Sequence, residues 1–163
     1  MTTLANDQVQ QLCTFYVGPL FLGVDVRVVQ EVIRYQEMTP VPLSRPGVEG
    51  LINLRGQIVT ALDPRIQMNL PPSESDELPM NVVIRIEDSI ASLLVDEIGD
   101  VVDIDPTRLE PPPSTLPASS GRFIESVFKM EDQLLLLLNA GRAIRTGDNN
   151  STSMRANDDQ SDD

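Results

Sequence analysis

The sequence predicts a mainly β protein made of two similar halves, each with about five short strands that close into a small barrel. Three observations support this fold class. Among 163 residues, 40% are hydrophobic, but there is no Trp and there are only four Phe and two Tyr, so Val, Ile and Leu must build the core. That composition favours strands. Short apolar runs alternate with turn residues along the chain. The second half also repeats the spacing of the first.

The internal repeat rests on four matches that occur in the same order in both halves. The matched pairs are Val24-Asp25 with Val95-Asp96, Pro42 with Pro113, Arg55-Gly56 with Glu131-Asp132, and Leu62-Asp63 with Leu138-Asn139. The first two pairs are 71 residues apart and the last two are 76 apart, which indicates a five-residue insertion in the second Pro-rich loop. We therefore expect a first barrel over about 20–75 and a second over about 80–135, with terminal segments that can cross over.

The first half begins after a flexible arm expected at residues 1–11. Leu12–Gly18 and Leu20–Val26 predict a hairpin around the turn at Gly18-Pro19. The next apolar segment, Val28–Tyr35, fits either a helical turn or a strand. It leads into a loop that contains three prolines, at Gln36–Pro46.

A second hairpin is predicted from the two apolar runs Gly50–Leu54 and Gln57–Leu62. Arg55-Gly56 forms its corner, because Gly accepts the positive φ that tight hairpin turns require. Asp63 can then cap a short helix over Pro64–Leu70, since Pro is favoured at a first helical position.

The second half follows a polar linker at Leu70–Pro79. Its predicted strands are Asn81–Glu87, Ile90–Asp96, Ile98–Ile104, Phe123–Met130 and Gln133–Asn139. The first of these alternates in a way typical of a half-buried strand, with Val83 on the outer face. The five leucines Leu134–Leu138 suit a strand buried on both faces. A short closing helix is expected at Ala140–Thr146, and then a disordered acidic tail over 147–163.

The composition argues against several classes of function. A net charge of −13 disfavours binding to nucleic acid or anionic lipid. The absence of His removes the commonest general base and metal ligand. The one cysteine, Cys13, lies in an apolar run, where we expect a buried thiol rather than a nucleophile.

No motif for chemistry stands out among the remaining residues. The carboxylates lack the spacing of a calcium loop, and the glycines do not form a phosphate-binding loop. We therefore expect no catalytic residue, no metal site and no cofactor, and we interpret the chain as a non-enzymatic interaction protein. No signal peptide pattern or membrane-length apolar run is present, so a cytoplasmic protein is expected.

One stretch carries the strongest functional signal. It contains Val48-x-Gly50-Leu51-Ile52-Asn53-Leu54-Arg55-Gly56-x-Ile58-Val59, then Asp63-x-Arg65, and it is preceded by Val24-Asp25-Val26 and Val29-Gln30-Glu31-Val32. This pattern resembles the signature of CheW-like domains, the coupling proteins of bacterial chemotaxis arrays, and the resemblance covers roughly residues 12–146. It implies two SH3-like five-stranded β-barrel subdomains packed together, with short helices.

The resemblance also implies a function, namely a scaffold that couples chemoreceptors to the chemotaxis histidine kinase. The implied partners are the regulatory domain of the kinase and the helical-hairpin tip of the receptor, with recruitment to membrane receptor arrays and array-level self-association. The implied receptor-binding residues are Val29, Glu31, Gly50, Asn53, Arg55, Val95, Ile98 and Gly99. The implied kinase-binding residues are Glu31, Ile33, Gln57 and Ile58.

Plainer interpretations of these residues stay open. Glu31 and Arg55 can form an ordinary surface ion pair, and Gly50 fits either a close backbone approach or a bulge. Structural roles are equally open for others: core packing for Val29, a turn contact for Asn53, and a strand end for Val95–Gly99. At the level of function, the alternative is an interaction module of a pilus or gliding pathway with other partners, because the same fold would serve both.

Overall fold

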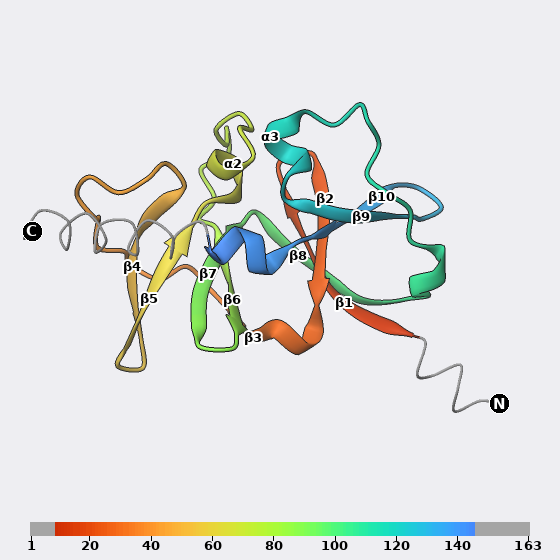
Figure 1. Ribbon diagram of the computed structural model, residues 1–163. Coiled ribbons are helices and arrows are strands. Elements are labelled where there is room, and N and C mark those ends of the chain that lie inside the picture. Colours follow the sequence, from red (N-terminus) through yellow and green to blue (C-terminus); the bar gives the residue numbers. More distant parts are fainter. Residues whose placement is uncertain (1–8, 146–163) are drawn as a thin grey trace, which may run out of the picture.

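The computed structural model describes residues 9–145 and contains two five-stranded sheets that pack side by side (Figure 1). The strands are β1 (Gln10–Val17), β2 (Leu20–Asp25), β3 (Val29–Ile33), β4 (Val48–Leu54), β5 (Gln57–Leu62), β6 (Met80–Ile86), β7 (Ser89–Val95), β8 (Glu97–Ile104), β9 (Ile124–Lys129) and β10 (Leu134–Leu138). The predicted fold class is therefore confirmed. β1 begins inside the segment expected to be an N-terminal arm, of which residues 1–8 lie outside the described residues. The acidic tail expected over 147–163 also lies outside them.

The two sheets have the same strand order once the two halves of the chain are exchanged. The first sheet runs β8-β1-β2-β10-β9 and the second runs β3-β6-β7-β5-β4. Each sheet thus combines the first hairpin of one half with the last three strands of the other. In both sheets the contact between these two groups includes a parallel pair, β2 with β10 and β5 with β7.

This exchange differs from the expected division into barrels over about 20–75 and about 80–135. Residues 80–95 belong to the same sheet as β3, β4 and β5, and β2 belongs to the other sheet. The reason lies in the short links that follow each first hairpin. The 3-10 helix η1 (Val26–Val28) carries the chain from β2 to β3, and Asp96 alone separates β7 from β8. A spacing repeat identifies equivalent strands, but it does not say which copy pairs with which.

Equivalent hydrogen bonds confirm the repeat itself. Thr39 bridges to Leu51, and Glu110 bridges to Val127, at the offsets of 71 and 76 residues found in the sequence. Each bridge joins the segment that follows one edge strand to the strand at the opposite edge, which closes the sheet into a barrel.

Helix caps show the same equivalence. The side chain of Asp63 accepts a hydrogen bond from the backbone N–H of Arg65 at the start of α2 (Pro64–Gln67). The side chain of Asn139, 76 residues later, accepts one from Arg142 at the start of the helical residues 140–145. Both caps satisfy helix N–H groups that would otherwise lack a partner.

Each barrel has its own small core, and a larger core lies between the two sheets. The larger cluster includes Phe15 and Leu22 from the first sheet and Val82 and Leu93 from the second. Helical residues 140–145, in blue near the centre of Figure 1, add Ala143 and Ile144 to it. Neither sheet could bury these side chains alone, so the two barrels form one folding unit.

The leucine run of β10 shows how one strand serves two cores. Leu135 and Leu137 pack inside the first barrel, whereas Leu136 and Leu138 face the shared core. The prediction of a strand buried on both faces is confirmed, with Leu134 partly exposed at its start. The half-buried pattern expected for Asn81–Glu87 is wrong at Val83, which is fully buried in the core of the second barrel.

The remaining helical segments are short. They are η2 (Pro106–Arg108) and α3 (Ala118–Gly121), both within the second Pro-rich loop. The ambiguous segment Val28–Tyr35 becomes the end of η1 followed by β3. In the described part of the chain, no helix has the length and apolar character to cross a membrane.

Candidate protein-interaction site

The corner of the β4–β5 hairpin places Arg55 at one end of the second barrel. Arg55 and Gly56 both have positive φ, at 52° and 88°, as a two-residue type I′ hairpin turn requires. The side chain of Asn53 accepts a hydrogen bond of 2.8 Å from the backbone N–H of Gly56. Asn53 thus makes the turn contact that sequence reasoning left open, and it is exposed two residues before Arg55.

Arg55 pairs with Glu31 from the opposite edge of the same sheet. Its Nη2 donates to Oε2 of Glu31, so the ion pair that the sequence analysis left open is formed. The carboxylate is mostly covered, with 20% of its side chain exposed, whereas the guanidinium is 70% exposed. The ion pair therefore fixes the guanidinium of Arg55 where the two edge strands of the barrel, β3 and β4, come together. The other N–H groups of the guanidinium stay available to a partner.

Gly50 permits this closure because another backbone passes directly over it. An added Cβ would stand 2.7 Å from the carbonyl oxygen of Thr39. Thr39 and Leu51 exchange two backbone hydrogen bonds of 2.8 Å beside it. Both interpretations open for Gly50 have support, because the close backbone approach is observed and the register of β4 with β5 shifts between Val48 and Gly50.

A second polar contact lies beside the ion pair. Nε of Arg85, on β6, donates to the side-chain oxygen of Gln30 on β3 at 2.7 Å, and its Nη2 lies 3.5 Å from that of Gln57 on β5. Ile58 follows Gln57 and is 58% exposed, which is high for a large apolar residue in a strand. Gln57 and Ile58 therefore belong to the same exposed end as Arg55, whereas Ile33 is half-buried and packs against the core of the second barrel.

The other predicted residues do not join this surface. Val29 is half-buried against the shared core. Val95 is fully buried, so its side chain has no surface to offer a partner. Ile98 is half-buried against the shared core, and an added Cβ at Gly99 would stand 2.5 Å from Oγ1 of Thr14. The segment Val95–Gly99 thus has clear structural roles at the crossing between the sheets.

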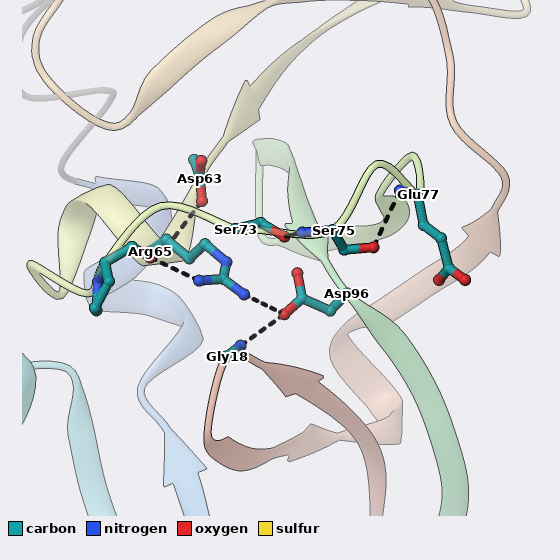
Figure 2. Close-up of polar contacts among 8 residues, drawn as sticks. Gly18, Asp63, Arg65, Ser73, Ser75, Glu77 and Asp96 are labelled. Carbon is teal, nitrogen blue, oxygen red and sulfur yellow. Dashed lines mark hydrogen bonds and ion pairs between the residues drawn. The ribbon is translucent and has the colours of Figure 1, made fainter.

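Sequence reasoning assigned no role to Arg65, although the Asp-x-Arg pattern pointed to it. Figure 2 shows Arg65 reaching from α2 to Asp96, with Nη2 to Oδ2 at 2.6 Å. The same oxygen accepts from the backbone N–H of Gly18 at 2.7 Å, and Nη1 of Arg65 donates to the carbonyl oxygen of Pro71. This network ties the second sheet to the first hairpin at the crossing point of the chain.

Two features of the described residues bear on metal binding and on nucleophilic chemistry. Within residues 9–145, no group of three or more acidic or cysteine side chains is arranged to hold a metal ion. Cys13 is buried, and burial raises the pKa of its thiol, which disfavours the nucleophilic thiolate. An exposed cation held at a barrel seam beside exposed apolar surface is typical of a site that recognises another protein.

The fold and this surface define a protein-interaction domain built from two β-barrels. The model of the CheW-like domain matches residues 11–147, and the chain belongs to this family. Its relatives include "Chemotaxis protein CheW" of Treponema pallidum, 27% identical over 137 residues that cover 82% of this chain and 81% of that protein. The protein of the same name from Thermotoga maritima is 28% identical over 145 residues, covering 88% and 94%.

A solved structure supports the same conclusion. The chain resembles the scaffolding protein TtCheW from Thermoanaerobacter tengcongensis, with a TM-score of 0.71 and 25% identity. The match covers 79% of this chain and 83% of that one. The two-barrel architecture of this chain is thus shared with a scaffold.

Proposed function

We propose that this chain is a non-enzymatic adaptor of bacterial chemotaxis, which couples chemoreceptors to the histidine kinase by binding both. The observation that carries the proposal is the match to the CheW-like domain over residues 11–147, since it spans both barrels. The relatives are named as chemotaxis proteins, and the structural neighbour is described as a scaffolding protein. An adaptor needs two partner surfaces held in fixed relation, and a pair of barrels with one shared core provides that.

We assign the surface around the Glu31–Arg55 pair to partner recognition. The mostly covered carboxylate of Glu31 holds the guanidinium in place, so that ordering Arg55 on binding costs little further entropy. Gln57 and Ile58 extend this surface along β5 and are the residues we assign to the kinase side. Asn53 and Arg55, at the corner, are those we assign to the receptor side.

Weak individual contacts are sufficient for an adaptor that bridges two partners. In an array, a chain that is bound to one partner is held close to the second, so the effective concentration of the second partner is high. The many linked contacts of the array strengthen binding further. Receptor state could then bias kinase activity through a bridge that performs no chemistry itself.

The test is a binding experiment with the full chain and two separate partners. The regulatory domain of the kinase and a receptor-tip fragment are each titrated alone and then together. The proposal expects binding to each and a ternary complex that both partners enter without competition. Competition between the two, or binding to neither, would contradict the proposal, and the second outcome would favour an interaction module of a pilus or gliding pathway.

A further inference from the structure

A pocket of about 530 Å³ opens beside α2, away from the surface assigned above. It lies between the segment that follows β3, the start of β4, the polar linker before β6 and the end of β7. Its lining residues are Tyr35, Met38, Glu49, Asp63, Arg65, Ile66, Leu70, Pro72, Ser73, Glu77, Leu78, Pro79, Leu94 and Asp96. None of the residues predicted from the sequence to bind a receptor or kinase is among them.

Part of the pocket lining is apolar. Leu94 is buried, and Met38 packs against the same small core. Ile66 and Leu78 also line the pocket and are 44% and 65% exposed, although both are large apolar residues. Water-exposed apolar surface of this kind is stabilised when another apolar group covers it.

Hydrogen bonds shape the linker that forms one wall, and one of them ties its start to α2. Nη1 of Arg65 donates to the carbonyl oxygen of Pro71 at 2.6 Å. The hydroxyl oxygens of Ser73 and Ser75 accept from the backbone N–H groups of Ser75 and Glu77 in turn, as Figure 2 shows. These contacts restrict the conformations of this wall, which lowers the entropy that a ligand would lose by ordering it.

The charges around the pocket are unbalanced. Four carboxylates line it, from Glu49, Asp63, Glu77 and Asp96, against the single guanidinium of Arg65. That guanidinium is already engaged by Asp96. Burial raises the pKa of Asp63, and burial together with the charge of Asp63 raises the pKa of Glu49. In the described part of the chain, neither Glu49 nor Glu77 forms an ion pair.

An apolar groove with excess negative charge complements a specific kind of side chain. Lysine and arginine carry an aliphatic stem that covers apolar surface and a cationic head that pairs with carboxylates. An anionic or purely apolar ligand would leave Glu49 and Asp63 uncompensated. The chain's own acidic C-terminal segment has the wrong sign, with five Asp and one Arg between Asp148 and Asp163.

We propose that this pocket binds a lysine or arginine side chain of a partner protein, flanked by an apolar residue. The aliphatic stem packs on Met38 and Leu94, the cationic head lies between Glu49 and Asp63, and the flanking apolar residue covers Ile66 and Leu78. The site goes beyond the proposed adaptor function, because it is separate from the Glu31–Arg55 surface and does not depend on the identity of either chemotaxis partner.

The test uses NMR titration of the isotope-labelled full chain with a small probe, the capped tripeptide Leu-Lys-Leu. The expected result is saturable shift changes at the amides of Glu49, Asp63, Ile66 and Leu78. The capped tripeptide Leu-Gln-Leu, which lacks the cation, should bind roughly 5- to 10-fold more weakly.

Matched variants show whether binding depends on the carboxylates of the pocket or on the overall negative charge of the protein. Combining Glu49→Gln with Asp63→Asn should weaken binding of Leu-Lys-Leu by roughly 10-fold or more, while Asn keeps the helix cap of α2 intact. Glu125→Gln removes an exposed carboxylate on β9 of the other sheet and should leave binding unchanged.

Three results would overturn the proposal. The first is equal binding of the two tripeptides, and the second is an equal loss of binding in Glu125→Gln. The third is displacement of Leu-Lys-Leu by the same concentration of spermidine, since a free polyamine has no apolar side chain to cover Ile66 and Leu78. None of these results bears on the chemotaxis partners, so the adaptor proposal is tested separately.

Discussion

The backbone of Thr39 passes so close to Gly50 that no side chain fits between them. The carbonyl oxygen of Thr39 would be 2.7 Å from a Cβ at Gly50, which is closer than real Cβ contacts come. This approach seals the second barrel, because it brings the segment after β3 onto β4 at the other edge. The equivalent position in the first barrel, 76 residues later, is Ser126, so the close contact belongs to one barrel alone.

We expect Gly50→Ala to lower the free energy of unfolding by about 1–3 kcal/mol, because the new methyl group must push the backbone of Thr39 aside. Urea denaturation measures the effect. Gly121→Ala is the matched control, since an added Cβ at Gly121 meets nothing within 4 Å. Equal stability of Gly50→Ala and Gly121→Ala would show that the closing contact is not needed.

Leu43 offers a substitution that should stabilise the protein. It has a positive φ of 59° and is 99% exposed, so it bears backbone strain without contributing burial. We expect Leu43→Asn to raise the free energy of unfolding by roughly 0.5–1 kcal/mol, since Asn tolerates this left-handed conformation better than Leu. Leu43→Ala removes the exposed side chain but keeps the strain, so thermal denaturation should show little gain for that control.

Arg55→Ala separates folding from binding. An ion pair with an exposed partner contributes under about 1 kcal/mol, so the melting temperature should change little. Binding to the receptor tip or to the kinase regulatory domain should weaken. Co-sedimentation measures this binding. Arg27→Ala breaks a similar exposed pair with Asp25 and should leave binding unchanged. A collapsed fold or unaltered binding in Arg55→Ala would contradict the assignment.

Asp63→Asn should change how stability depends on pH. Burial is the main reason that the pKa of Asp63 is raised, so the folded state holds its proton to a higher pH than the unfolded chain does. Stability arising from this group is therefore present at low pH and is lost as pH rises through the raised pKa. Asn cannot ionise and still caps α2, as Asn139 caps its own helix.

Denaturation at a series of pH values measures this effect. The variant should exceed the natural protein in stability at pH 7, and its advantage should shrink as the pH falls below the raised pKa of Asp63. Asp25→Asn should behave in the opposite way, because the hydrogen bond from Arg27 lowers the pKa of Asp25. A loss of stability at pH 7 in Asp63→Asn would show that its charge helps the fold.

The exchange of hairpins predicts that neither half of the chain folds alone. Cutting at residue 76, within the linker, separates β1–β5 from β6–β10, and each fragment then lacks strands of both sheets. We expect circular dichroism to show little β structure in either fragment and recovery when the two are mixed. A stable second fragment would indicate that the sheets are more independent than their shared core suggests.

Much of the fold could be predicted because local patterns decide it. The hairpin corner at Arg55-Gly56, the cap at Asp63 and the leucines of β10 each follow from residue types at short range. The pairing of β2 with β10 could not be predicted. The repeat identifies equivalent strands in the two halves, but it does not show whether a strand pairs with one from its own half or from the other half. The burial of Val83 was missed for a related reason, since its covering side chains, such as Ile52, come from another hairpin.

The candidate site was predictable only in part. Glu31 and Arg55 were found through the family pattern, and their contact is now seen directly. Val95 and Gly99 carry the same kind of signal, but their burial and close packing come from the crossing of the chain between sheets. The contact between Arg65 and Asp96 joins residues 31 positions apart, and no local pattern relates them.

The single-residue link at Asp96 has a mechanical consequence. Its backbone N–H donates to the carbonyl oxygen of Tyr16, and its side chain accepts from Gly18 and Arg65, so one of the two passages of the chain between the sheets is held by three hydrogen bonds. A one-residue link with these contacts has little freedom to bend. We therefore expect the two barrels to move together as one body rather than to rotate about Asp96.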